Sequence, residues 1–128
     1  MTNATATQTA ILVVEDNRDT RESLKTLLEL LGYTVAVAVD GAEGVERALE
    51  LRPRVALVDF GLPRLDGCQV GRRLREALGP AVLLVSYTAH SGPEARARAL
   101  EAGFDLHLVK PLDWNLFATW LAEAVGDL

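Results

Sequence analysis

Five polar side chains that could take part in chemistry follow short apolar runs of this sequence. They are Glu15, Asp16, Asp59, Thr88 and Lys110. Three carboxylates in one place repel each other unless a cation neutralises them, and oxygen ligands without His or Cys suit Mg²⁺ rather than zinc. A divalent ion beside a carboxylate, an ammonium group and a hydroxyl can transfer a phosphoryl group, and the carboxylate can itself be the nucleophile. If the fold brings these residues together, they therefore predict phosphoryl chemistry.

The apolar runs alternate with helical patterns, which is typical of an α/β domain with a parallel sheet. We expect strands over residues 11–14, 33–39, 55–58, 81–86 and 104–109. We expect helices that start near Asn17, Asp40, Asp66 and Ser91, and a last helix over 113–125. In an open doubly wound sheet, ligands bind at the carboxyl ends of the strands. The five polar side chains all leave strands at that edge, so we expect them to meet there.

The composition favours one soluble, cytoplasmic domain. A length of 128 residues predicts a single core, which we place over 10–126 after a flexible tail over 1–9. Thirteen basic against eighteen acidic residues disfavour direct binding of nucleic acid or of a membrane surface, and no apolar run is long enough to span a bilayer. Cys68 is the single cysteine, so the chain has no internal disulfide, and we expect a buried thiol without a chemical role.

The sequence resembles the receiver domain of two-component response regulators over residues 10 to 126. The resemblance rests on four segments in order, each at the end of an expected strand. They are Val13 to Asn17, Val58 to Pro63 with the following Asp66-Gly67, Thr88-Ala89, and Val109 to Pro111. It implies a flavodoxin-like, doubly wound, five-stranded parallel sheet of order 2-1-3-4-5 with five helices.

Carried over to this chain, the resemblance makes Asp59 the phosphoacceptor. It implies that Asp16 and Asp59 bind Mg²⁺ through their carboxylates, Gly61 through its backbone carbonyl, and Glu15 through a coordinated water. The phosphoryl donor is then a phosphohistidine on a histidine kinase or phosphotransfer protein, or a small acyl phosphate. Such a domain is a phosphoacceptor rather than an enzyme in its own right.

The resemblance also implies a switch. Lys110 contacts one phosphoryl oxygen, Thr88 moves to hydrogen-bond another, and the Lys110–Pro111 peptide is cis. The surface that responds is built from the helix after Ser91, the strand over 104–109 and the last helix. Through this surface the domain controls a partner or forms a homodimer.

One position departs from the common pattern of the family, and two others occupy places that influence how long the phosphoryl group survives. His107 stands where many receivers have Tyr or Phe, so the side chain that swings inward on activation would here carry a pH-dependent charge, unless His107 is an ordinary half-buried strand residue. Gly61 leaves no side chain beside Asp59 to hold or block an attacking water, whereas His90 could reach the phosphoryl group and modulate dephosphorylation. His90 could equally be a solvent-facing loop residue.

The last helix has a wider apolar arc than covering a sheet requires. The extra breadth predicts a partner surface that includes Trp114 and Leu121, with the alternative that Trp114 folds back over the edge of the core.

Other functions remain open at this point. The segment 59–63 resembles receivers of hybrid histidine kinases, so the chain could be a phosphorelay intermediate or a piece of such a kinase. A small Mg²⁺-dependent phosphohydrolase with an Asp nucleophile would need a second acid where Gly61 stands. A flavin carrier is disfavoured because Glu15 and Asp16 would repel its phosphate, and a purely structural pseudo-receiver because the acidic site is intact. We expect no output domain within the 128 residues.

Overall fold

The computed structural model describes residues 10–61, 66–89 and 92–125. Its centre is a parallel five-stranded sheet of order β2-β1-β3-β4-β5, which confirms the predicted topology. The strands are β1 (Ile11–Val14), β2 (Val35–Ala38), β3 (Val55–Asp59), β4 (Leu83–Thr88) and β5 (Leu106–Val109). β1 and β3 are buried along their whole length, as continuous apolar strands in the middle of a covered parallel sheet should be.

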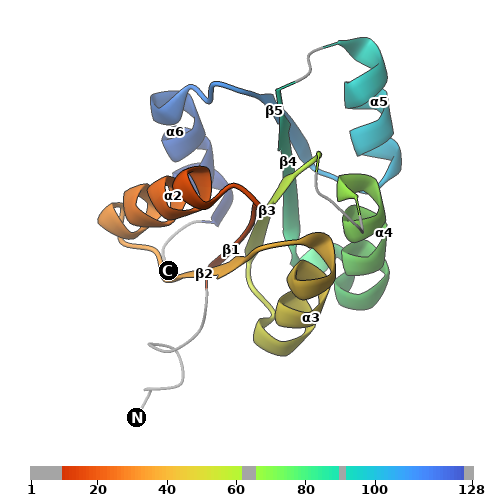
Figure 1. Cartoon of the computed structure of the whole chain (residues 1–128), viewed down its shortest axis with the longest axis horizontal. Helices are drawn as coiled ribbons and strands as arrows, with labels where there is room; N and C mark the ends of the chain where they lie inside the picture. The colour runs from red at the N-terminus through yellow and green to blue at the C-terminus, as the bar shows by residue number, and fades with distance from the viewer. Residues whose placement is uncertain (1–9, 62–65, 90–91, 126–128) are drawn as a thin grey trace.

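Five helices cover the two faces of the sheet (Figure 1). They are α2 (Arg18–Leu30), α3 (Gly41–Leu51), α4 (Gly67–Leu78), α5 (Pro93–Glu101) and α6 (Trp114–Val125). Residues of α2 and α6 belong to one apolar cluster, and residues of α3, α4 and α5 to the other. None of the helices within the described ranges is long and apolar enough to cross a bilayer.

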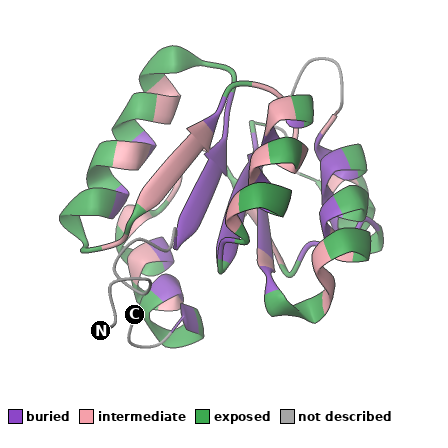
Figure 2. Cartoon of the chain, turned by 90° about the horizontal axis from the view of Figure 1, so that it is seen from below, coloured by how far each residue is buried: buried purple, intermediate pink, exposed green. Residues whose placement is uncertain are grey.

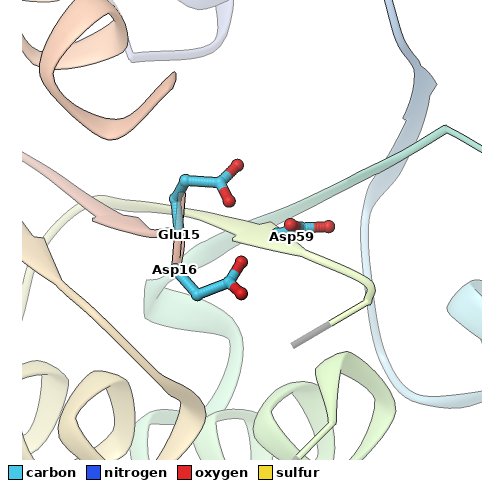
Figure 3. A group of neighbouring side chains, drawn as sticks. All are labelled: Glu15, Asp16 and Asp59. Carbon is cyan, nitrogen blue, oxygen red and sulfur yellow. The ribbon is translucent and has the colours of Figure 1, made fainter. Parts of the chain in front are cut away.

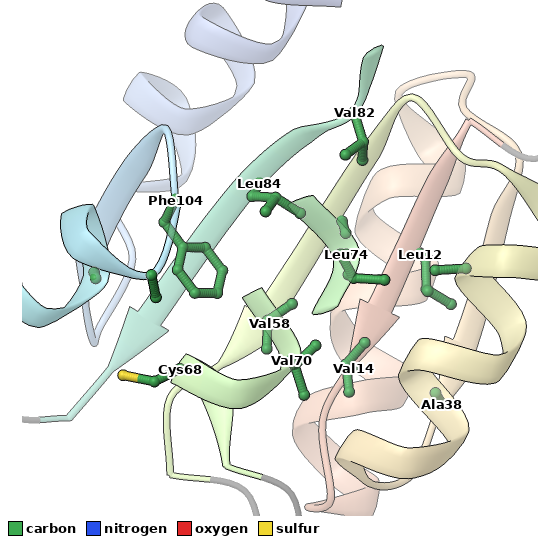
Figure 4. Packing of buried hydrophobic residues seen from close by; sticks show 14 residues of the cluster. Leu12, Val14, Ala38, Val58, Cys68, Val70, Leu74, Val82, Leu84 and Phe104 are labelled. Atoms are coloured by element: carbon green, nitrogen blue, oxygen red, sulfur yellow. The ribbon is translucent and has the colours of Figure 1, made fainter. Parts of the chain in front are cut away.

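The sheet divides the core into these two clusters, and side chains of each strand alternate between them. Leu12, Val58 and Leu84 face the cluster with α4, in which Leu74 and Phe104 also pack (Figure 4). Burial is deepest along the central strands, while the helices turn exposed faces outward (Figure 2). The single cysteine, Cys68, is a buried free thiol in this cluster, as predicted.

Three helices begin directly after the predicted capping residues, because side chains of these residues accept hydrogen bonds from free amides of the first turn. Asn17 accepts a hydrogen bond from the Thr20 amide at 2.9 Å, and Asp40 accepts one from the Glu43 amide at 2.8 Å. Asp66 forms a full capping box with Gln69. The predicted cap Ser91 lies outside the described residues.

β4 differs from its predicted range of 81–86. Gly79–Ala81 form a 3₁₀ turn with a proline in its first positions, so the strand starts later, at Leu83. It also runs two residues further, because Tyr87 and Thr88 pair with Leu108 and Val109 of β5. β4 is therefore shifted rather than shortened, whereas β2 and β5, at the edges of the sheet, are shorter than their predicted ranges.

The predicted partner surface on the last helix needs a correction. Leu121 is fully buried, together with Phe117 and Val125, so its assignment to an exposed surface is wrong. These three residues are four positions apart and form the stripe that packs against the sheet. Trp114 is half-buried and meets the Phe117 ring edge-on at 6.0 Å. The exposed large apolar side chain of α6 is that of Leu116, with 67% of its surface accessible.

Candidate functional site

Three carboxylates meet at the carboxyl ends of β1 and β3. Glu15 and Asp16 directly follow β1, and Asp59 is the last residue of β3 (Figure 3). One oxygen from each side chain lies within 4.8 Å of the other two. Glu15 and Asp59 are buried, with 1% and 8% of their surfaces accessible, whereas Asp16 is exposed. Such a set of hard oxygen donors, open to solvent on one side, fits a cation such as Mg²⁺.

The register of the sheet brings these acids together. Val14 of β1 pairs with Val58 of β3, so Glu15 and Asp59 leave the two strands at the same level. The amide of Glu15 donates to the carbonyl of Ala38 at 3.0 Å, which extends the β1–β2 pairing by one residue. The turn that follows is held by Arg21, whose Nη1 donates to the Glu15 carbonyl at 3.1 Å.

Glu15 is a buried carboxylate with three neighbouring donors. Its Oε2 accepts the Asn17 amide at 3.0 Å, and its Oε1 accepts the hydroxyl of Tyr87. The same Oε1 lies 3.6 Å from the ammonium of Lys110. These partners compensate a charge that would otherwise be costly to remove from water.

Tyr87 is a site residue that the sequence prediction missed. Its side chain is buried, and burial followed by the contact with Glu15 raises the pKa of its phenol above the ordinary value. The hydroxyl therefore keeps its proton and acts as a donor. A signal was available, because a buried tyrosine hydroxyl needs a polar partner, but the predicted strand ended before this residue.

Lys110 lies between the two buried acids. Its Nζ is 3.6 Å from Glu15 Oε1 and 3.6 Å from Asp59 Oδ2, and it sits 4.7 Å above the centre of the Tyr87 ring. Its backbone amide donates to the Thr88 carbonyl at 2.7 Å, and the Lys110–Pro111 peptide is cis.

The two oxygens of Asp59 have different neighbours. Oδ1 accepts the Gly61 amide at 3.0 Å, while Oδ2 faces Lys110. A Cβ at position 61 would lie 3.9 Å from Oδ1, an ordinary van der Waals distance. Gly61 thus leaves open space next to the oxygen that its own amide holds.

A cavity of about 500 Å³ opens at Phe60 and Gly61, the two residues that follow Asp59. Phe60, Gly61 and the buried Thr88 line it on the sheet side, and Arg98 with the first turn of α5 lines the other side. The predicted residue Thr88 therefore borders a space that lies between Gly61 and α5.

His107 lies on β5 behind this cavity wall. Its Nδ1 shares a hydrogen bond of 2.7 Å with the hydroxyl of Ser86, and its ring meets Phe60 edge-on at 5.6 Å. Its Nε2 is buried and has no hydrogen-bond partner among the described residues. Burial, with a smaller contribution from Arg96, lowers the pKa of His107 and favours the neutral ring.

The structure thus brings Glu15, Asp16, Asp59 and Lys110 together, with Thr88 on the adjoining cavity. His107 is separated from them by Phe60 and Ser86. His90 lies outside the described residues, so its predicted influence on dephosphorylation stays a prediction.

Comparison with known proteins gives the family of this chain. A family model described as the response regulator receiver domain matches residues 11–121. Response regulator MprA of Mycobacterium ulcerans (strain Agy99) is 43% identical over 101 residues, which cover 79% of this chain and 43% of that protein. Transcriptional regulatory protein PrrA of Mycobacterium tuberculosis (strain ATCC 25618 / H37Rv) is 43% identical over 105 residues, or 82% of this chain and 45% of that protein. The chain spans less than half the length of these relatives.

Solved structures show the same fold. The receiver domain of sensor histidine kinase PA1611 from Pseudomonas aeruginosa PAO1 matches with a TM-score of 0.84 and 31% identity, covering 94% of this chain and 99% of that one. That structure has a magnesium ion coordinated in its active site cleft. Chemotaxis protein CheY4 of Vibrio cholerae matches with a TM-score of 0.83 and 24% identity, covering 91% and 98%.

Proposed function

Because this chain belongs to the response regulator receiver domain family, a group of signalling domains rather than enzymes, we propose that it is a phosphorylation switch with Asp59 as phosphoacceptor. The observation that carries the proposal is the position of Asp59. It is buried at the end of a central strand, 3.6 Å from the Lys110 ammonium and within 4.8 Å of two further carboxylates. A phosphohydrolase that uses the same aspartate as nucleophile is the wrong class for this family.

We assign Mg²⁺ to the acidic cluster. Asp16 and Asp59 would hold it through their carboxylates, Gly61 through its carbonyl and Glu15 through a water. When bound, the cation neutralises the carboxylates and the incoming phosphoryl oxygens, which makes close approach of the two anions feasible. The exposed Asp16 leaves the site accessible from solvent, as a cation and a donor both require.

The donor would be a phosphohistidine of a histidine kinase or phosphotransfer protein. The P–N bond of the donor breaks, a P–O bond forms to the Asp59 carboxylate, and the imidazole leaves with the electron pair of the broken bond and takes up a proton. Lys110 is placed to bind a phosphoryl oxygen on Asp59. The Gly61 amide holds Oδ1 of Asp59 and thereby orients the carboxylate.

The response would start at Thr88, whose hydroxyl would donate a hydrogen bond to a phosphoryl oxygen. His107 lies on β5, two strands away from Asp59 on β3, and its ring packs against Phe60. It is our candidate for the side chain that moves together with Thr88. The surface that changes is formed by α5, β5 and α6, and it would control a partner or form a homodimer. His90 would tune how long the phosphoryl group survives.

From the proposed kinase partner, we infer that the switch acts in the cytoplasm. We assign no nucleic-acid or membrane contact to this domain, whose eighteen acidic residues outnumber its thirteen basic ones. The curated relatives are named as response and transcriptional regulators and are more than twice as long as the matched region, so any DNA contact of such a protein would belong to its other part.

A second candidate role uses the same chemistry. The chain would then be a phosphorelay intermediate or the receiver part of a hybrid histidine kinase. This role is favoured by the similarity to the receiver domain of a sensor histidine kinase, which is 31% identical to this chain.

Intact-mass measurement after incubation with acetyl phosphate and Mg²⁺ tests the proposal. We expect one phosphoryl group on the wild type and none on Asp59→Asn, with Asp66→Asn as a matched control that still accepts it. A phosphoryl group on Asp59→Asn would overturn the assignment. So would a wild type that stays unmodified with acetyl phosphate and with histidine kinases alike.

A further inference from the structure

Tyr87 contacts two residues of the proposed phosphorylation site, Glu15 and Lys110. Its hydroxyl is bonded to Glu15 and not to Asp59. Its hydroxyl donates to Glu15 Oε1, and its ring lies 4.7 Å below the Lys110 ammonium. The side chain is 1% exposed and belongs to the cluster with α2 and α6. It is paired with Asp59 across β3 and β4, which fixes its level relative to the phosphoacceptor.

Lys110 is shared between two carboxylates rather than bonded to either. Its distances to Glu15 Oε1 and to Asp59 Oδ2 are both 3.6 Å, longer than the 2.7–2.9 Å typical of a charge-assisted hydrogen bond. Glu15 does not need Lys110 as a direct donor, because the Tyr87 hydroxyl already serves the same oxygen and the Asn17 amide serves the other.

We propose that Tyr87 is a positioning residue for the phosphorylation of Asp59. Its hydroxyl satisfies Glu15, and its ring supports the Lys110 ammonium, so the ammonium stays available to a phosphoryl oxygen on Asp59. The inference rests on the proposed function of Asp59. It adds an uncharged residue, Tyr87, to the site. This residue acts through Glu15 and Lys110.

Loss of the hydroxyl has a defined consequence. In Tyr87→Phe, the buried Glu15 loses a donor, and the ammonium is the mobile group that can replace it. Lys110 then closes on Glu15 and withdraws from Asp59, which slows phosphoryl transfer. The cation site keeps all three carboxylates, and Asp59 is less compensated once Lys110 withdraws, so the affinity for Mg²⁺ does not weaken.

The test compares Tyr87→Phe with Tyr33→Phe, since these are the two tyrosines of the chain. At saturating Mg²⁺, the rate of modification by acetyl phosphate is followed by intact mass, and Mg²⁺ affinity is measured by calorimetry without a phosphoryl donor. We expect Tyr87→Phe to react about fivefold to tenfold more slowly, the range of one lost hydrogen bond, with Mg²⁺ affinity unchanged or tighter. Tyr33→Phe should match the wild type in both.

Two results with the variant would overturn the inference. One is an unchanged rate in Tyr87→Phe, and the other is a parallel loss of rate and Mg²⁺ affinity, which would indicate general damage to the pocket. The contact is also visible without any reaction, as a slowly exchanging, downfield phenol proton in the NMR spectrum of the wild type that is absent from Tyr87→Phe. Its absence from the wild type contradicts the inference even if the variant does not fold. A wild type that shows this proton but accepts no phosphoryl group contradicts the proposed function instead.

Discussion

The side chains around Asp59 belong to two faces of the sheet, and they are held in different ways. On the face of α2 and α6, Glu15, Tyr87 and Lys110 form a closed group. Every oxygen of the buried Glu15 has a donor, and the Lys110 ammonium lies between two carboxylates over an aromatic ring.

On the face of α5, the side chains near Asp59 border open space. Thr88 and Phe60 line an open cavity of about 500 Å³, and the Nε2 of His107 is buried with no hydrogen-bond partner in the described part of the chain. α5 itself buries Ala99 as its one fully buried residue, and no side chain among the described residues caps its first turn.

The difference suggests a division of work. Transfer of a phosphoryl group requires fixed charges, since misplacing them by a small distance reduces the rate strongly. A switch requires a segment with two packings of similar free energy, and a weakly anchored helix beside a cavity can provide it. We therefore expect changes on the first face to alter the chemistry, and changes on the second to alter the response.

The largest effect is expected for Lys110→Met, which removes the ammonium from the closed group. The rate of phosphorylation by acetyl phosphate should fall by about a hundredfold, as for loss of one placed donor to a developing charge. Lys25→Met is the matched control, because Lys25 is the other lysine and pairs only with the exposed Glu29 among the described residues. Equal rates for the two variants would contradict the role of the closed group.

Thr88→Ala tests the second face. The variant should still accept a phosphoryl group, but the effect of phosphorylation on hydrogen exchange in α5 should shrink by roughly tenfold, because the hydroxyl can no longer bond to the charged group. Thr88→Ser keeps the hydroxyl and should restore the effect. A full response of α5 in Thr88→Ala would show that the signal takes another route.

Gly61→Asn places a side chain beside Asp59 Oδ1, where the structure has room for a Cβ at 3.9 Å. An amide near this oxygen can orient or obstruct an attacking water, so the rate of dephosphorylation should change severalfold while phosphorylation changes less. The decay of the modified species after removal of the donor measures it. An unaltered decay would place residue 61 outside the path of the water.

The smallest effect concerns His107 and pH. Burial and Arg96 lower its pKa, and Arg98 over the Phe60 ring is a further nearby cation. Below the ordinary value of 6.5, the unfolded chain binds a proton that the folded chain resists. The free energy of unfolding should therefore decrease as the pH falls below about 6.5 and be fully retained above it.

Denaturant unfolding of His107→Phe at several pH values isolates this contribution. The variant should lose less stability than the wild type between neutral and mildly acidic pH, whereas His90→Phe, which alters the other histidine, should follow the wild type. Identical pH dependence in wild type and His107→Phe would show that His107 is not held in its neutral form.

The acidic site could be predicted because Glu15, Asp16 and Asp59 directly follow continuous apolar runs, and parallel strands end on one edge. Tyr87 was missed because its contact depends on where β4 ends and on the lateral register that pairs Tyr87 with Asp59. Leu121 was misplaced for a related reason. An arc of apolar residues as wide as that of α6 does not identify the stripe that faces the sheet, and the structure places it along Phe117, Leu121 and Val125.

The most direct test of the division between the two faces is hydrogen exchange of the whole chain, with and without beryllofluoride as a phosphoryl substitute on Asp59 in the presence of Mg²⁺. We predict that amide protection changes along α5 and β5, including His107, while the amides of α2 around Leu24 and Leu28 stay as they are. Equal changes in α2 and α5, or changes confined to α2, would contradict the account.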